Sequence, residues 1–76
     1  MASIDKIVDK MKRQPNGVRV PEADKVLKSL GYELRNQEGS HIQYKNEENG
    51  DLFTLVHRNH NIKKFYVDEI LKKIKD

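Results

Sequence analysis

The spacing of the apolar residues changes twice along this chain, and this change is the strongest constraint on its fold. Toward both ends, apolar residues recur every three or four positions, which is the spacing of one face of a helix. Between Ser40 and Lys45, apolar and polar residues alternate one by one, as in a strand with one buried face. The pattern therefore predicts an α+β chain in which helices cover one face of a central sheet.

Three segments have helical spacing. The first is predicted from Ser3, a suitable N-cap residue, to Arg13, where a QPNG turn follows. The second begins at Pro21, because proline suits the first turn of a helix, and ends at Gly31, because glycine is favoured just beyond a helix. The third lies within residues 62–76. The predicted core-facing residues of these helices are Ile4, Ile7, Val8, Met11, Ala23, Val26, Leu27, Leu30, Val67, Ile70, Leu71 and Ile74.

Three strands are predicted between the second and third helices, over residues 32–37, 40–45 and 52–57. A glycine in each connection favours the tight turns of an antiparallel meander. If Ile42 and Tyr44 point toward the helices, the pleat places the intervening side chains on the open face. These outward residues are His41, Gln43 and Lys45. The predicted fold is a three-stranded antiparallel sheet covered on one face, in the order helix, helix, three strands, helix.

Length and composition restrict the chain to one small domain. Its 76 residues are 36% apolar and 36% charged, so residues 1–76 are predicted to form one thin-cored domain. Residues 1–17 are predicted to add an N-terminal helix and turn to this domain. Without cysteine, the chain has neither a disulfide nor a cysteine-ligated zinc ion. A cytoplasmic location without membrane contact is expected, because there is no signal-peptide pattern and no apolar run near the ~20 residues that span a membrane.

Basic residues are more frequent toward the two ends of the chain. Residues 1–31 carry seven basic and four acidic residues, residues 32–60 three and five, and residues 61–76 five and three. A polyanion such as RNA would therefore meet positive charge from the ends of the chain. The net charge of +3 is also compatible with an ordinary solvated surface.

His41 is the first candidate for chemistry, because a histidine side chain can accept and donate a proton near neutral pH. It follows Gly39, which allows a ligand to approach the backbone closely, and Ser40, which offers a hydroxyl and an N–H group to phosphate oxygens. The alternative is that His41 is an ordinary exposed residue on a strand.

The segment HRNH, residues 57–60, raises the question of a metal site. His57 and His60 could bind one ion, but no carboxylate cluster accompanies them, so solvated loop histidines are the simpler interpretation and no metal is expected. Lys63 and Lys64 either form the solvated face of a helix or contact phosphate groups. The sequence has no phosphate-binding glycine loop and no Ser-His-Asp arrangement.

Over residues 21–74 the sequence resembles the HicA family of bacterial toxin–antitoxin ribonucleases. The resemblance depends on four features in order. A helix ends in Leu-x-x-x-Gly-aromatic at residues 27–32, and Gly-Ser-His followed by an aromatic residue spans residues 39–44. A third strand then reaches a histidine, His57, and a closing helix follows.

Two features depart from the family pattern. Val56 stands where many members have proline, and residues 64–66, Lys-Phe-Tyr, stand where many have Gly-Thr. We expect the first departure to affect how His57 is presented and the second to affect contacts near the start of the last helix. Neither is expected to touch His41.

The resemblance implies a fold similar to a double-stranded-RNA-binding domain and an activity as a metal-independent endoribonuclease, an mRNA interferase. It implies His41 as the catalytic residue, single-stranded or messenger RNA as substrate, no cofactor, and a HicB-like antitoxin that covers the active face. DNA should not be cut, because it lacks the 2′-hydroxyl. The expected RNA-binding residues are Arg35, Gly39, Ser40, Lys45, His57, Arg58, Lys63 and Lys64.

Two other classes of function remain open on the sequence alone. A non-catalytic RNA-binding module of the same fold would hold RNA without cutting it. A protein-interaction domain would use the open sheet face only for a partner chain. Growth arrest relieved by a neighbouring gene would favour the toxin over both.

Overall fold

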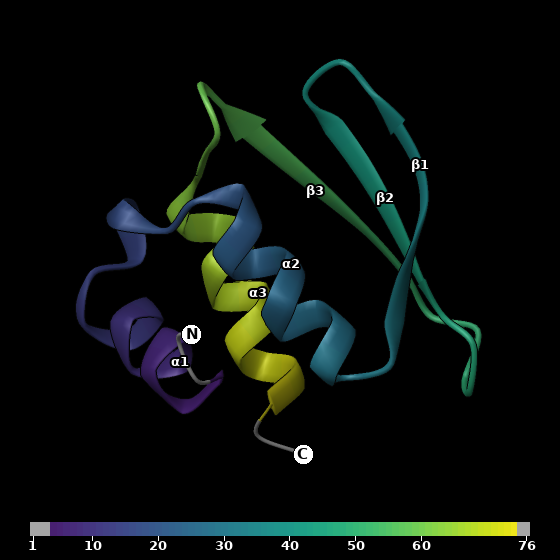
Figure 1. Cartoon of the computed structure of the whole chain (residues 1–76), viewed down its shortest axis with the longest axis horizontal. Coiled ribbons are helices and arrows are strands. Elements are labelled where there is room, and N and C mark those ends of the chain that lie inside the picture. Colours follow the sequence, from purple (N-terminus) through teal and green to yellow (C-terminus); the bar gives the residue numbers. More distant parts are fainter. Residues whose placement is uncertain (1–3, 75–76) are drawn as a thin grey trace.

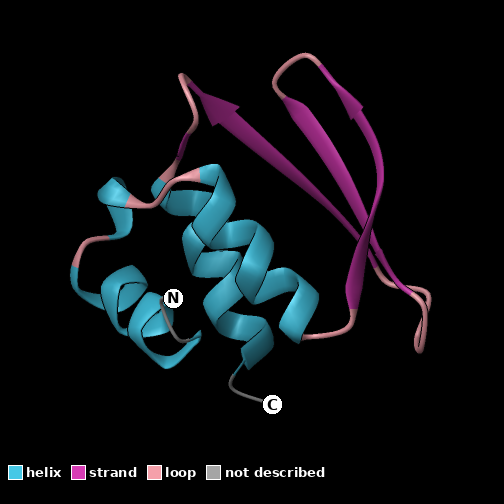
Figure 2. Cartoon of the chain, viewed as in Figure 1, coloured by secondary structure: helices cyan, strands magenta, loops and turns pink. Residues whose placement is uncertain are grey.

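The computed structural model describes residues 4–74, in which the helices lie on one side of an antiparallel sheet (Figures 1 and 2). In chain order the elements are α1 Ile4–Arg13, the 3₁₀ helix η1 Pro15–Gly17, α2 Val20–Ser29, β1 Tyr32–Glu38, β2 His41–Asn46, β3 Leu52–Arg58, β4 Asn61–Ile62 and α3 Lys64–Ile74. The predicted three helices and three main strands are confirmed in this order. The N-cap predicted at Ser3 lies outside the described residues. Among residues 4–74, no helix is both long enough and apolar enough to span a membrane.

The sheet has four strands in the order β1-β2-β3-β4, so the prediction of three strands was wrong by one. The additional strand, β4, consists of Asn61 and Ile62, which pair with Arg58 and His57. Two residues are too few to show an alternating pattern in the sequence. In addition, the turn before β4 has positive φ at both Asn59 and His60, where such turns usually contain glycine.

The chain before α2 holds β4 in place. The N–H group of Ile62 donates to the carbonyl oxygen of Val18 at 2.8 Å, and the N–H group of Val20 donates to that of His60 at 2.9 Å. These bonds attach β4 and the turn before it to the chain at the beginning of α2.

The core lies between the helices and the inner face of the sheet. Ile42 and Tyr44 are almost completely buried, which confirms the predicted inward face of β2. The helix α1 contributes Ile7 and Met11 to the same core. The other buried apolar residues are Val18, Ala23, Val26, Leu27, Tyr32, Phe53, Leu55, Ile62, Val67 and Ile70.

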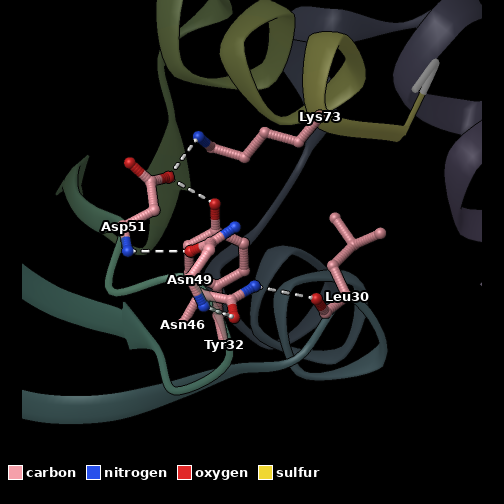
Figure 3. A network of polar contacts seen from close by, with 6 residues as sticks. All are labelled: Leu30, Tyr32, Asn46, Asn49, Asp51 and Lys73. Atoms are coloured by element: carbon pink, nitrogen blue, oxygen red, sulfur yellow. Dashed lines mark hydrogen bonds and ion pairs between the residues drawn. The ribbon is translucent and has the colours of Figure 1, made fainter.

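A polar network closes the end of the sheet where β2 turns into β3 (Figure 3). Asp51, just before β3, accepts hydrogen bonds from the Tyr32 hydroxyl and from the ammonium group of Lys73, the latter at 3.0 Å. The Lys73 nitrogen also lies 5.3 Å and 5.2 Å from the ring centroids of Tyr32 and Phe53, within the range of a cation–π interaction. The network therefore joins the last turn of α3 to β1 and β3.

Asn46, a buried polar residue at the end of β2, extends this network to α2. Its side-chain amide donates to the carbonyl oxygen of Leu30 at 3.2 Å. Its side-chain oxygen accepts from the N–H groups of Glu48 at 2.9 Å and Asn49 at 3.3 Å. One side chain thus provides hydrogen-bond partners both for N–H groups of the tight turn after β2 and for the free carbonyl group at the end of α2.

The network also makes the stability of the fold depend on pH. Hydrogen bonds from Tyr32 and Lys73 lower the pKa of Asp51. The contribution of Asp51 to the free energy of unfolding is therefore present above the unfolded-state pKa and is lost as the pH falls through the folded-state pKa. Burial alone would lower the pKa of Lys73, but its interactions with Asp51 and Tyr32 raise it overall. The contribution of Lys73 is therefore lost as the pH rises through its folded-state pKa.

The substitution Asp51→Asn should lower the free energy of unfolding at pH 7. The difference from the wild type should disappear below the folded-state pKa of Asp51, where the wild-type carboxyl group is also protonated. Urea unfolding followed by circular dichroism at neutral and acid pH measures both values. Glu47→Gln, which removes an exposed carboxylate from the same connection, should change the free energy by less than about 0.5 kcal/mol at either pH. Equal stability of Asp51→Asn and the wild type at pH 7 would contradict this role.

Candidate functional site

His41 is the first residue of β2 and follows a two-residue turn formed by Gly39 and Ser40. Gly39 has a φ of 59°, in the left-handed region, whereas Ser40 keeps a negative φ. Positive φ at the first turn position is typical of the type II′ turns that match the twist of the two strands they join. Glycine at this position therefore allows the tight turn that places His41 at the end of the sheet.

The main chain of β3 holds this turn from the other side. The N–H group of His57 donates to the carbonyl oxygen of Ser40 at 3.1 Å, one step beyond the pair formed by His41 and Val56. The end of β3 and the turn between β1 and β2 lie at the same end of the sheet (Figure 1). His57 thus belongs to the surroundings of His41 through its backbone.

The side chain of His57 points away from that of His41. Residues of β3 alternate between the two faces, and the buried Leu55 marks the helix-facing side, so His57 also lies on that side. There its ring stacks on the ring of His60 with centroids 5.5 Å apart, and its Nδ1 atom accepts from the N–H group of His60 at 3.3 Å. Within residues 4–74, no three His, Cys, Asp or Glu side chains are grouped so that they could hold a metal ion.

The exposed side chain of His41 lies on the open face and lines a hollow of about 320 Å³. Side chains of three strands enclose this hollow: Asn36, Glu38, His41, Gln43 and Thr54. A second hollow of about 370 Å³ shares Gln43 and Thr54 with the first, so the two are adjacent. The open face therefore offers one continuous surface along β2.

The second hollow is cationic. Arg35 is the extra residue of a β-bulge, since the pairing passes from Leu34 directly to Asn36, and the hollow is lined by both Arg35 and Lys45. Neither of these two cations has an ion-pair partner in the described part of the chain. Leu52, 70% exposed, lines the same hollow. Two free cations beside an exposed apolar side chain can hold a phosphate group and the less polar part of a nucleotide.

The other basic residues expected to bind RNA differ in whether they form ion pairs. Arg58 and Lys63 have no ion-pair partner among residues 4–74, whereas Lys64 is paired with Asp68 at 2.9 Å. Arg58 lies two residues beyond Val56 on β3, so by alternation it is on the same face as His41. Lys64 is already engaged within its own helix.

The structure corrects one expectation about the family pattern. Val56 lies directly opposite His41 on the neighbouring strand, so the expectation that a departure at this position would not touch His41 was wrong. Side chains opposite each other have Cβ atoms about 4.5–5.5 Å apart, so Val56 forms one side of the surroundings of His41.

Several residues that line these hollows were not predicted from the sequence as part of the site, among them Asn36, Glu38, Leu52 and Thr54. The predicted strand bounds placed the turn at residues 38 and 39, which leaves Glu38 out of the strand. The structure places the turn at Gly39 and Ser40, so Glu38 lies opposite His41. Leu52 and Thr54 come from a strand whose register the sequence does not specify.

Comparison with known families identifies the chain. A family model described as HicA toxin of bacterial toxin–antitoxin systems matches residues 20–75, well over half of the sequence. The chain belongs to the HicA toxin family. Neither the comparison with curated proteins nor that with solved structures gave a match. The matched region begins after α1 and η1 and includes the His41 turn and all four strands, and membership of a toxin–antitoxin family implies an antitoxin partner.

Gly39→Ala should lower the free energy of unfolding by about 1–2 kcal/mol, because alanine is strained at positive φ. A Cβ atom at Gly39 would have no atom within 4 Å, so the loss should come from the backbone alone. Gly17→Ala provides the matched control, since Gly17 has no positive φ and should change the free energy by less than about 1 kcal/mol. Urea unfolding of both variants measures the difference, and equal effects would exclude backbone strain as the reason for glycine at residue 39.

Proposed function

We propose that this member of the HicA toxin family is a metal-independent endoribonuclease, an mRNA interferase, with His41 as a catalytic residue. The main support is one observation: an exposed histidine stands on a tightly held turn and faces a hollow that continues into a cationic one. We further propose that the helices and the three-stranded meander correspond to a fold similar to a double-stranded-RNA-binding domain. DNA is not a substrate in this proposal.

The chemistry explains why a histidine is suited to this position. RNA cleavage without a metal ion requires a base that removes the proton of the 2′-hydroxyl, an acid that protonates the leaving 5′-oxygen, and positive charge near the phosphorus. His41 supplies one of the two proton transfers. The products are a 2′,3′-cyclic phosphate and a 5′-hydroxyl, which DNA cannot form because it lacks the 2′-oxygen.

The positions of the cations divide their roles. Lys45 lies four residues from His41 along β2, which corresponds to roughly 13 Å at the rise of a strand. We therefore assign Lys45 and Arg35 to a phosphate beside the one that is cleaved. Arg58 is diagonal to His41 across the strand pair, at a separation of about 7–8 Å, so it is better placed to stabilise charge at the reacting phosphate. Lys63 and Lys64 would contact more distant phosphates.

His41→Ala should lower the rate of RNA cleavage by about 10²–10⁴-fold, the usual contribution of a positioned acid or base. Cleavage of a labelled RNA is measured in excess EDTA, in which the wild type should remain active. The free energy of unfolding should change by less than about 0.5 kcal/mol, because His41 is exposed. His60→Ala, an exposed histidine outside the site, should keep the wild-type rate. Wild-type activity that requires added zinc or manganese would contradict the proposal, and RNA binding without any cleavage would favour a non-catalytic RNA-binding module.

Arg35→Ala and Lys45→Ala should each weaken RNA binding and make it less dependent on salt. Each phosphate contact with a single strand contributes about 0.7 to the slope of log K against log salt concentration, because it releases counterions. Fluorescence anisotropy with the His41→Ala protein measures this slope without cleavage. The matched control is Lys25→Ala, which should leave the slope unchanged, because Lys25 is exposed on α2 and has no ion-pair partner within residues 4–74. Equal slopes for all three variants would show that RNA does not occupy the cationic hollow.

A HicB-like antitoxin should compete with RNA, because we propose that it covers the open face that carries His41. When the antitoxin is added to labelled RNA bound by the His41→Ala protein, the RNA should be fully released once each toxin has one antitoxin binding site available. Higher salt should weaken the RNA complex more steeply, since phosphate contacts release counterions. RNA that stays bound to a toxin saturated with antitoxin would show that the two surfaces are separate.

A further inference from the structure

Glu38 and His41 face each other across the turn that joins β1 and β2. They form the last pair of this strand ladder, and both side chains line the hollow of about 320 Å³ on the open face. Residues that are directly opposite hold their Cβ atoms about 4.5–5.5 Å apart. A carboxylate and an imidazole, both exposed, therefore border the same small space.

No other side chain that lines this hollow can exchange a proton with RNA near neutral pH. Asn36 and Gln43 carry neutral amides, and Thr54 carries an alcohol. On the other flank of His41, the cross-strand neighbour is the aliphatic Val56. The next glutamate along β1, Glu33, lies opposite Lys45 in the strand register, near the other end of the ladder, and does not line the hollow. A second proton carrier beside His41 would therefore be Glu38.

Building on the ribonuclease function proposed above, we propose that Glu38 is the general base of the reaction and His41 its general acid. The ionised carboxylate of Glu38 takes the proton of the 2′-hydroxyl, and the 2′-oxygen forms a bond to the phosphorus. As the bond between the phosphorus and the 5′-oxygen breaks, the imidazolium of His41 gives its proton to that oxygen. One bond to phosphorus forms and one breaks, and the step requires no further reactant.

The geometry of neighbouring strands suits this division of roles. In a displacement at phosphorus, the attacking and leaving oxygens lie roughly in line on opposite sides. Two side chains that rise from adjacent strands can each approach a phosphate between them from its own side. Arg58, diagonal to His41 on the same face, offsets the negative charge that Glu38 brings near the phosphate.

The substitution Glu38→Gln should lower kcat by about 10²–10⁴-fold, because glutamine keeps the shape of the side chain but cannot accept the proton. The kcat/KM of the wild type should fall at both low and high pH, and Glu38→Gln should lose the fall at low pH. Glu33→Gln removes the same charge from the same exposed strand and should retain the wild-type rate and profile. Circular dichroism confirms that all variants are folded.

A second substrate separates the base from the acid. Uridine 3′-(4-nitrophenyl phosphate) has a leaving group that needs no protonation, so a general acid is dispensable while a general base is not. On this substrate His41→Ala should recover to within about tenfold of the wild-type rate, less than the usual contribution of an acid or base, while Glu38→Gln remains slow. Release of 4-nitrophenolate is followed by its absorbance.

The possible results distinguish this proposal from the function on which it rests. If the wild type cleaves RNA and Glu38→Gln cleaves it equally fast, Glu38 is not a catalytic residue although the ribonuclease function stands. Recovery of Glu38→Gln instead of His41→Ala on the nitrophenyl substrate would overturn the assignment of base and acid. A wild type that cleaves no RNA would overturn both the proposed function and the role of Glu38.

Discussion

The accessibility of the site depends on a hydrogen bond in the core, from the hydroxyl of Tyr44 to the carboxylate of Asp24 at 2.6 Å. Tyr44 is 1% exposed, and burial together with Asp24 raises its pKa far above the ordinary value, so the hydroxyl stays protonated and donates. This bond joins β2 to α2 and, together with the burial of Ile42 and Tyr44, keeps this face of β2 turned inward. A shift of one residue would turn every side chain of the strand to the other face and would bury His41.

The two ends of the sheet are held by different means. At the end near Asp51, side chains connect β1 and the beginning of β3 to α3. The buried Asn46 connects the end of β2 to the end of α2. At the opposite end, the turn before His41 is held mainly by backbone bonds, such as the one from His57 to Ser40. Backbone bonds leave the side chains of the turn free, so the strand end can be rigid while its exposed groups remain available to a ligand. The arrangement suits the proposed site, which would bind RNA and would also be covered by an antitoxin.

Local patterns in the sequence predicted most of the fold and the face of the sheet on which His41 lies. Apolar spacing revealed the helices, alternation at Ile42 and Tyr44 revealed which face His41 occupies, and glycines marked the turns. Features that depend on pairing between distant residues were not predictable in this way. The bulge at Arg35 and the two-residue strand β4 have no local signal. For the same reason, the sequence placed His57 near His41 but did not show that its side chain lies on the other face.

The separation of the core from the open face has a consequence for how the chemistry can be examined. The residues that hold the fold, such as Tyr44 and Met11, are buried, whereas Glu38 and His41 are exposed and form no ion pair with any described residue. Substitutions at exposed positions usually change stability by less than about 0.5 kcal/mol, which even a small domain with a thin core tolerates. Losses of activity at these two positions can therefore be attributed to the site itself rather than to unfolding. The residues beside His41 come from β1 and β3, through strand pairing. They can be tested by substitution in the same way as the histidine itself.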